Sequence, residues 1–299
     1  MDRPCFVLAG ALLLSGCAVE IPGTEIGGGD SSGSGDSGGT GSTSDPAGGK
    51  LSSNGLVLDT SALALLDPTA LGRWESTTVA VADSGSLDGL LSHAAGAEHL
   101  EYLALCALDE GTTLRADGRD YPGLYGLGTG WVADGCDESC QHWVSACLLA
   151  HANAYGIAVT VSLRGNQPGL VWDEAIAAEF ELQEAAFYGN VFEVTGDIDA
   201  FDEPLYACSG RALIAFDEDP EHHESSLDYL QKRICGAGAG ECGLTHTGPC
   251  VYPPFATESI CRQDAGWDGY YANCEGENYD DPELVPVYPE VITTYLVEE

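Results

Sequence analysis

Apolar positions after residue 50 follow both the period of strands and the period of helices. Alternating or clustered apolar and β-branched residues predict extended backbone at 56–58, 78–81, 112–114, 157–163 and 291–297. Helical spacing and start or stop residues predict helices over 97–108, 137–154 (with Gly156 as a stop) and 219–233. Because strands and helices do not alternate as regular βαβ repeats, we expect an α+β fold.

Residues 173–188 fit two structures. Their alanines and glutamates favour a helix, for which Gly189 would be a C-terminal stop. Phe180-Glu181-Leu182, within the same segment, also fits extended backbone. The pattern therefore leaves both alternatives open here.

The N-terminus has the pattern of an export signal. Met1-Asp2-Arg3 is followed by the apolar run Phe6–Leu14, which is shorter than the roughly 20 residues that cross a bilayer core. Leu14-Ser15-Gly16-Cys17 comes next and resembles the lipobox of bacterial lipoproteins. That resemblance implies a signal peptide at 1–16 and a diacylglycerol on the Cys17 thiol. The alternative is an ordinary cleaved secretory signal.

Lipid on Cys17 would place the protein in the cell envelope. Several acyl chains make anchoring stable where one chain would be marginal. Ala18 follows the cysteine, where an aspartate is absent. By resemblance to the sorting of such lipoproteins, this residue implies the outer membrane.

Residues 17–50 predict a flexible linker. Gly, Ser, Thr and Asp dominate from Gly23 to Gly49 and leave little apolar surface to offset the entropy of ordering. A chain of this kind has an end-to-end reach of roughly 30 Å. Residues 51–299 have the length of one large domain or two small ones, and we expect one disulfide-rich globular domain.

The charge balance excludes some partners. The chain has 48 acidic and 10 basic residues, and its formal net charge is −38. Nucleic acid and anionic membrane surfaces would be repelled, so we expect membrane contact through the lipid anchor only, and an unknown envelope or extracellular ligand. The acidity itself fits solubility after export, a salty habitat or binding of divalent cations.

Cysteines outside the signal and the lipid site are even in number. An even set in an exported protein predicts disulfides rather than free thiols. Zinc is the alternative, since Cys136-x3-Cys140 and Cys147-x3-His151 resemble ligand spacings. The disulfide candidates are Cys106, Cys136, Cys140, Cys147, Cys208, Cys235, Cys242, Cys250, Cys261 and Cys274.

Helical geometry restricts the pairing of these cysteines. On the helix predicted from residue 137, Cys140 and Cys147 lie about 10.5 Å apart along the axis, too far for a bond between them. A disulfide between Cys136 and Cys140 would also have unfavourable geometry if both residues were helical. We therefore expect this helix to be linked to other elements, with Cys106 as one partner. The dense group from Cys235 to Cys274 predicts a loop-rich C-terminal part.

Three segments of the body resemble a set of uncharacterised cysteine-rich lipoproteins of myxobacterium-like bacteria. They are Cys140–Ala150 (CQHWVSACLLA), Ser162–Gly165 (SLRG) and Glu184–Phe192, which contains AFYGN. The likeness covers about Leu100 to Cys274. It supports export and disulfides and implies no activity, catalytic residue or cofactor.

Catalytic motifs are not evident in the sequence, so we lean toward a protein that is not an enzyme and assign no catalytic residue. The folded part has no Gly-x-Ser-x-Gly elbow, and none of its histidines lies in a His-Glu-x-x-His pattern. A weak calcium candidate consists of Asp264, Asp268 and Glu275, which mimic three positions of an EF-hand loop. A disulfide-bound turn explains the same residues.

Three functions fit these observations. The first is a non-enzymatic binding or structural module of the cell envelope, which we favour. The second is a secreted hydrolase whose site has no recognised motif. The third is a calcium-stabilised structural module, in which calcium would be the one bound cofactor.

Overall fold

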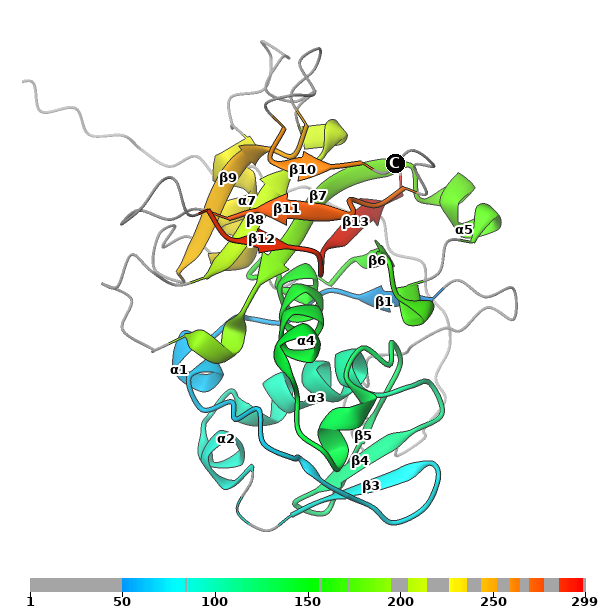
Figure 1. Ribbon diagram of the computed structural model, residues 1–299, viewed down its shortest axis with the longest axis vertical. Coiled ribbons are helices and arrows are strands. Elements are labelled where there is room, and N and C mark those ends of the chain that lie inside the picture. The colour runs from blue at the N-terminus through cyan, green and yellow to red at the C-terminus, as the bar shows by residue number, and fades with distance from the viewer. Residues whose placement is uncertain are drawn as a thin grey trace, which may run out of the picture. The chain divides into compact units, whose positions relative to one another are not determined.

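The fold is α+β and contains three β-sheets in the described part of the chain (Figure 1). Residues 40–299 form one unit. Within the described residues, no helix is long and apolar enough to cross a membrane. The computed structural model describes residues 50–83, 85, 87–155, 158–170, 173–194, 204–213, 226–235, 243–251, 259–263, 269–276 and 285–297.

The largest sheet has six strands in the order β1-β6-β13-β7-β8-β9. All neighbouring strands are antiparallel except β8 and β9, which are parallel. Its longest strand, β7, is buried along almost its whole length because both faces of the sheet are covered. The strands are β1 (Leu51–Ser53), β6 (Thr160–Arg164), β13 (Ile292–Leu296), β7 (Leu182–Gly189), β8 (Leu205–Ser209) and β9 (Leu244–Pro249).

Helices cover one face of this sheet. Ala185 and Phe187 of β7 point into the main apolar core, which α3, α4 and α7 help to form. The helix α4 begins after Asp137, whose side chain accepts a hydrogen bond from the Cys140 amide. These helices are α3 (Gly96–Ala107), α4 (Glu138–His151) and α7 (Ser226–Cys235).

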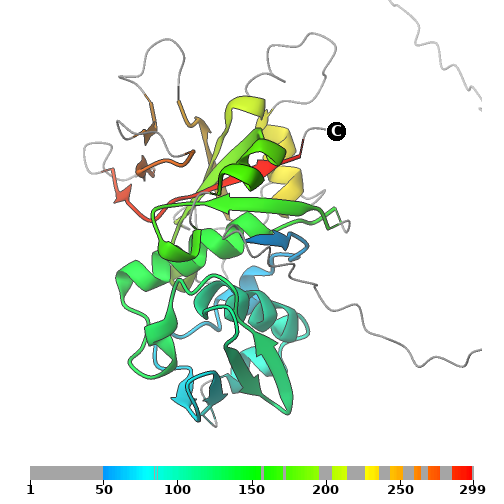
Figure 2. The same cartoon turned by 90° about the vertical axis from the view of Figure 1, so that its right-hand side faces the viewer.

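A small three-stranded sheet covers the opposite face. Because side chains alternate along a strand, Ala186 and Tyr188 of β7 point toward this sheet, away from Phe187. Figure 2 shows the small sheet on one side of the large one and α7 on the other. Its strands are β10 (Cys261–Arg262), β11 (Asn273–Glu275) and β12 (Val287–Tyr288).

The third sheet lies beside α3 and joins β2, β3, β4 and β5 in that order. A two-residue turn, Asp117-Gly118, connects β4 to β5, and both residues have positive φ (46° and 73°). This is the geometry that Asp-Gly hairpins favour. The strands are β2 (Gly72–Trp74), β3 (Val79–Ala82), β4 (Thr113–Ala116) and β5 (Arg119–Pro122).

Short helices complete the described fold. Those with α-helical geometry include α1 (Thr60–Leu63), α2 (Asp88–Ser92) and α5 (Glu174–Glu179), and residues 211–213 are helical as well. Three are 3₁₀ turns: η1 (Thr129–Val132), η2 (Pro168–Leu170) and η3 (Val191–Glu193).

Most of the predicted elements are confirmed. The helix predicted at 97–108 is α3, the helix predicted from 137 is α4, and the strands predicted at 78–81, 112–114 and 291–297 are β3, β4 and β13. The open segment 173–188 divides into the helix α5 and the strand β7. The strand predicted at 157–163 begins only at Thr160, and the helix predicted at 219–233 is described from Ser226.

The strand predicted at 56–58 is wrong. Leu56 and Leu58 are buried and Val57 is exposed, so the alternation exists, but Leu56 forms only an isolated bridge with Ala152. The pairing of β1 with β6 ends at Ser53. The Val159 amide, which would continue it, donates to the Asn54 side chain instead of to the backbone. The bridge to Ala152 also explains why α4 ends at His151, earlier than predicted.

A β-bulge interrupts the pairing of β7 with β13. Thr294 pairs with Ala185 and Tyr295 pairs with Gln183, so no residue of β13 is opposite Glu184 in the strand register. A bulge changes the direction of neighbouring side chains. Glu184 points to Arg233 of α7, whereas Gln183 borders a pocket on the surface.

Candidate functional site

Disulfides connect the cysteines around α4. Cys106 of α3 bonds to Cys147 of α4, with Cα atoms 5.9 Å apart, so the predicted role of Cys106 is confirmed. Cys140 and Cys147 are not bonded to each other, as predicted. The doubt about Cys136 with Cys140 is corrected: they are bonded, because Cys136 precedes the N-cap and lies outside the helix, which brings the Cα atoms to 5.2 Å.

The later cysteines form a second group. Cys208 bonds to Cys250 and Cys261 bonds to Cys274, and all four are buried. Cys235 is also disulfide-bonded. Cys242 and the predicted lipid site Cys17 lie outside the described residues.

The zinc alternative does not fit the observed sulfur chemistry. Cys106, Cys147 and His151 bring possible ligand atoms within 4.8 Å of one another. The two sulfurs are bonded to each other, however, and zinc is bound by thiolates. His151 is engaged as well, since its Nδ1 lies 2.7 Å from the Cys147 carbonyl oxygen.

The calcium candidate is described at one residue only. Glu275 belongs to β11, and its carboxylate lies 4.0 Å from Arg262 Nη2. Its backbone carbonyl accepts a hydrogen bond from Tyr188. Asp264 and Asp268 lie outside the described residues, so this candidate stays a prediction.

A serine and a histidine meet in the core. Ser52 Oγ lies 2.7 Å from His151 Nε2 and 2.7 Å from the Tyr125 hydroxyl. All three side chains are buried, and burial lowers the pKa of His151 to about 4. Neither Ser52 nor His151 lines a described pocket. The pair therefore satisfies polar atoms that are buried in the core.

A pocket of about 480 Å³ opens at the edge of the large sheet next to α5. This volume is within the range of small-molecule sites. Its apolar walls include Ala177, Phe180, Leu182 and Ala212. Its polar groups are Arg164, Glu181, Gln183, Arg211 and Tyr295, and we call this site the cationic pocket.

Arg164, at the end of β6, is held firmly in the wall of this pocket. Its Nη2 donates to the Phe180 carbonyl oxygen at 2.7 Å, and its guanidinium carbon lies 3.5 Å from the centre of the Tyr295 ring. The Tyr295 hydroxyl donates in turn to the Gly269 carbonyl oxygen at 2.7 Å. Desolvation by the surrounding protein lowers the pKa of Arg164 from its ordinary high value.

Gln183 contributes a donor that has no partner. Its Oε1 accepts the Tyr271 hydroxyl and the Arg211 amide, both at 3.4 Å. Its Nε2 is buried and lacks a hydrogen-bond partner in the described structure. Buried polar atoms are nearly always satisfied, so an unpaired donor in a residue of the pocket wall is unusual.

The charge of the cationic pocket is opposite to that of the chain. Two arginines and the exposed Glu181 line it, so its described lining is net positive in a chain of charge −38. A second hollow, of about 550 Å³ beside α2, is different: Asp83, Asp88 and Asp117 outnumber Arg115 there. Arg115 is already paired with Asp120 at 2.9 Å. The cationic pocket is therefore the better candidate for an anionic ligand.

Sequence reasoning did not select the residues of the cationic pocket. Arg164 is part of the SLRG segment and directly follows a predicted strand, so an arginine at a buried edge in a chain with few basic residues was an available signal. Gln183 and Arg211 carried no such signal, because only the bulge in β7 and the end of β8 bring them to this edge.

Comparison with known proteins gives no relative from which function can be transferred. No protein family matches the chain. No curated protein and no solved structure matches it either.

Proposed function

We propose that this chain is a lipid-anchored protein of the cell envelope whose folded part binds a small carboxylate in the cationic pocket. The observation that carries the binding role is the positive, partly apolar pocket, whose wall includes Gln183 with a buried Nε2 that has no partner among the described residues. Arginine and amide donors suit a carboxylate, which accepts paired hydrogen bonds. The apolar wall suits a short hydrocarbon group beside the charge.

The net charge favours a small ligand over a polyanion. A polyanion would meet the field of the whole acidic surface, which repels it. A ligand with one charge is repelled much less, because salt screens charges beyond about 8 Å. The arginines then act at contact distance.

Export and anchoring have separate support. The lipobox-like residues before Cys17 and the linker that follows suit a tethered domain. Disulfides in the body suit an oxidising compartment, where such bonds persist. The outer membrane is part of this proposal, on the basis of Ala18.

Binding is tested by titration of the full chain in detergent with sodium butyrate, butanol and butylamine. Butyrate should bind, and the uncharged alcohol and the cation should not. Arg211→Gln should weaken butyrate binding about tenfold, the effect of one charge-assisted hydrogen bond. The matched control is Arg73→Gln, which removes an exposed arginine outside the pocket that is paired with Asp83.

Gln183→Glu provides a second test at nearly constant side-chain size. It replaces the orphan donor by a carboxylate oxygen, so butyrate binding should be lost rather than weakened. Equal affinity of the wild type, Arg211→Gln and Gln183→Glu would rule out this pocket as the site.

The anchor is tested by mass spectrometry of the N-terminal peptide. The peptide should begin at Cys17 and carry acyl chains. Cys17→Ala should move the protein from the membrane fraction to the soluble fraction. An intact N-terminus in the cytosol would disprove the proposed location and would leave the binding result untouched.

A further inference from the structure

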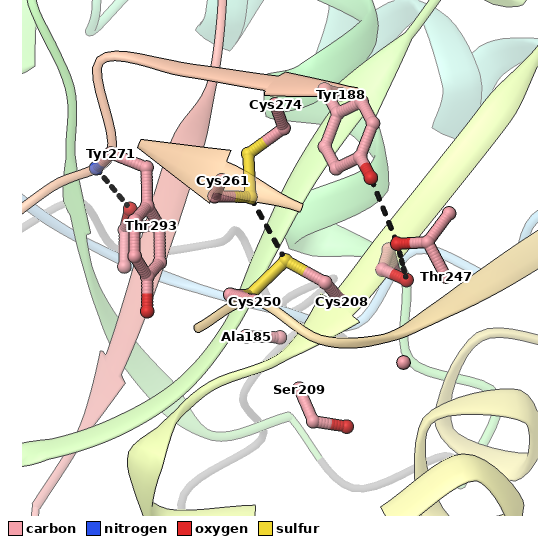
Figure 3. Close-up of a disulfide and its surroundings, with 12 residues drawn as sticks. Ala185, Tyr188, Cys208, Ser209, Thr247, Cys250, Cys261, Tyr271, Cys274 and Thr293 are labelled. Carbon is pink, nitrogen blue, oxygen red and sulfur yellow. Dashed lines mark hydrogen bonds between the residues drawn. A yellow bond between two sulfur atoms is a disulfide. The ribbon is translucent and has the colours of Figure 1, made fainter. Parts of the chain in front are cut away.

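Two disulfides of the described fold lie in direct contact. The Sγ atoms of Cys208 and Cys261 are 3.3 Å apart, although each is bonded to a different cysteine (Figure 3). We call this group the paired-disulfide cluster; it consists of Cys208, Cys250, Cys261 and Cys274.

The backbone holds the cluster in place from both sheets. Cys261 and Cys274 are direct partners on β10 and β11 of the small sheet. Cys208 is on β8 of the large sheet, and Cys250 directly follows β9. The Cys261 amide donates to the Cys250 carbonyl oxygen at 2.9 Å, so both disulfides are fixed in contact by main-chain bonds.

Thiol–disulfide exchange needs a thiolate next to a disulfide sulfur. If the bond between Cys261 and Cys274 is reduced, the Cys261 sulfur already lies beside Cys208. Such prior positioning makes an intramolecular step much faster than the same step between separate molecules.

We infer that the paired-disulfide cluster is a thiol–disulfide exchange site whose co-reactant is a dithiol. In the first step the dithiol reduces the bond between Cys261 and Cys274 and is itself oxidised to a disulfide. In the second step the Cys261 thiolate attacks Cys208 Sγ. The bond between Cys208 and Cys261 forms, the bond to Cys250 breaks, and the electron pair leaves on the Cys250 sulfur, which takes up a proton.

The exchange changes what the crosslinks connect. In the described state one disulfide lies within the small sheet and the other joins β8 to the residue after β9. After exchange, one disulfide joins β8 of the large sheet to β10 of the small sheet, and thiols are left at Cys250 and Cys274. Access of the dithiol requires local opening of strands only two or three residues long, which few hydrogen bonds hold.

Two single variants of the full chain test the second step without any reductant. Cys274→Ser and Cys261→Ser remove the same disulfide, so they lose the same crosslink, but they leave different sulfurs. With Cys274→Ser, the remaining Cys261 thiol should exchange, and alkylation should label Cys250 as well as Cys261. With Cys261→Ser, the 3.3 Å contact with Cys208 is lost and only the Cys274 sulfur remains, within 4.8 Å of Cys208. The label should then stay on Cys274, and the bond between Cys208 and Cys250 should remain intact.

The readout is acid quenching, alkylation with N-ethylmaleimide, digestion with pepsin at acid pH and mass spectrometry of the peptides. Label on Cys261 alone in Cys274→Ser would overturn the inference. If either variant fails to fold, the wild type treated with an equimolar amount of dithiothreitol decides: a peptide pair joined through Cys208 and Cys261 supports exchange, and label confined to Cys261 and Cys274 overturns it.

Discussion

The two faces of the large sheet are stabilised in different ways. On the helix face, α3, α4 and α7 bury a continuous apolar core, and one ion pair, Arg233 with Glu184, lies inside it. On the opposite face, the buried core contains the paired-disulfide cluster and three tyrosines in mutual ring contact, of which Tyr188 and Tyr206 are stacked, and the covering strands are only two or three residues long. Long amphipathic helices bring enough apolar area for a core, whereas very short strands do not and depend on crosslinks.

Removing disulfides should have the largest effect on the free energy of unfolding, and it tests whether the two faces differ in how they are stabilised. In the loop-entropy model, Cys106→Ala with Cys147→Ala opens a loop of sequence separation 41 and costs about 4 kcal/mol. Cys261→Ala with Cys274→Ala opens a loop of separation 13 and costs about 3 kcal/mol. Urea unfolding of each double variant measures both values.

The local effect on the small sheet should be larger for the Cys261–Cys274 bond, although its loss costs less in overall stability. Hydrogen exchange should show that loss of the bond between Cys261 and Cys274 opens the small sheet while α4 stays protected, because the helix retains its apolar core. Loss of protection in α4 of that same variant would show that the two faces unfold together. The two faces would then not be stabilised independently.

The role of Cys106 as a disulfide partner of α4 could be anticipated from sequence, whereas its pairing with Cys147 in particular and the paired-disulfide cluster could not. A helix fixes the axial distance between residues, so it excluded a bond between Cys140 and Cys147 and implied links to other elements, among which we expected Cys106. The later cysteines lie on short strands whose register the sequence does not set. The hydrophobic periodicity therefore does not predict which of these cysteines pair with each other.

The cationic pocket escaped prediction for a related reason. Its lining comes from the ends of β6 and β13, from α5 and the start of β7 that follows it, from the segment after β8 and from Gly269. Which strand ends lie side by side can be predicted only when the strand order of the sheet is known. The order β6-β13-β7 places segments next to one another that are far apart in the chain. The bulge that separates Gln183 from Glu184 is likewise a property of the pairing with β13.

The ion pair on the helix face should be the next largest contribution. Arg233 Nε lies 3.1 Å from Glu184 Oε1, and Arg233 Nη2 donates to the Ala150 carbonyl oxygen at 2.9 Å. Arg233→Met leaves a buried carboxylate with hydrogen bonds from Tyr229 and Thr294 only, and should cost about 3 kcal/mol in urea unfolding.

A double variant separates charge from packing at this pair. Arg233→Met with Glu184→Gln removes both charges and should recover much of the loss, because no uncompensated ion remains. A double variant that is less stable than Arg233→Met would mean that the carboxylate is held by its other donors and does not depend on the arginine.

Acid should weaken the helix face through His151. Burial lowers the pKa of His151 to about 4, whereas the unfolded chain keeps a value near 6.5. Between these values the unfolded state binds more protons, so stability is full above about pH 6.5 and falls as the pH drops toward 4, by about 3 kcal/mol. Urea unfolding across this window, with His151→Gln as the variant that cannot titrate, measures the difference. If the free energy of unfolding depends on pH in the same way in both proteins, His151 does not cause the loss of stability in acid.

The smallest effect should come from the contact that joins the two faces. Glu290, just before β13, accepts Ser139 Oγ at 2.8 Å and lies 3.2 Å from His142 Nδ1, and both partners belong to α4. Burial raises the pKa of Glu290, but these bonds outweigh it and leave the pKa below its ordinary value.

The stabilisation by Glu290 is therefore present above the ordinary carboxyl pKa and is lost as the pH falls through the lowered one. Glu290→Gln should cost about 1 kcal/mol at neutral pH and progressively less in acid, because the wild-type carboxylate becomes neutral there too. Urea unfolding at neutral and acid pH measures this, with Ser139→Ala as the control that removes one bond and keeps the charge. An equal cost of Glu290→Gln at both pH values would mean that the contact acts through packing, and the two faces would then be joined without electrostatics.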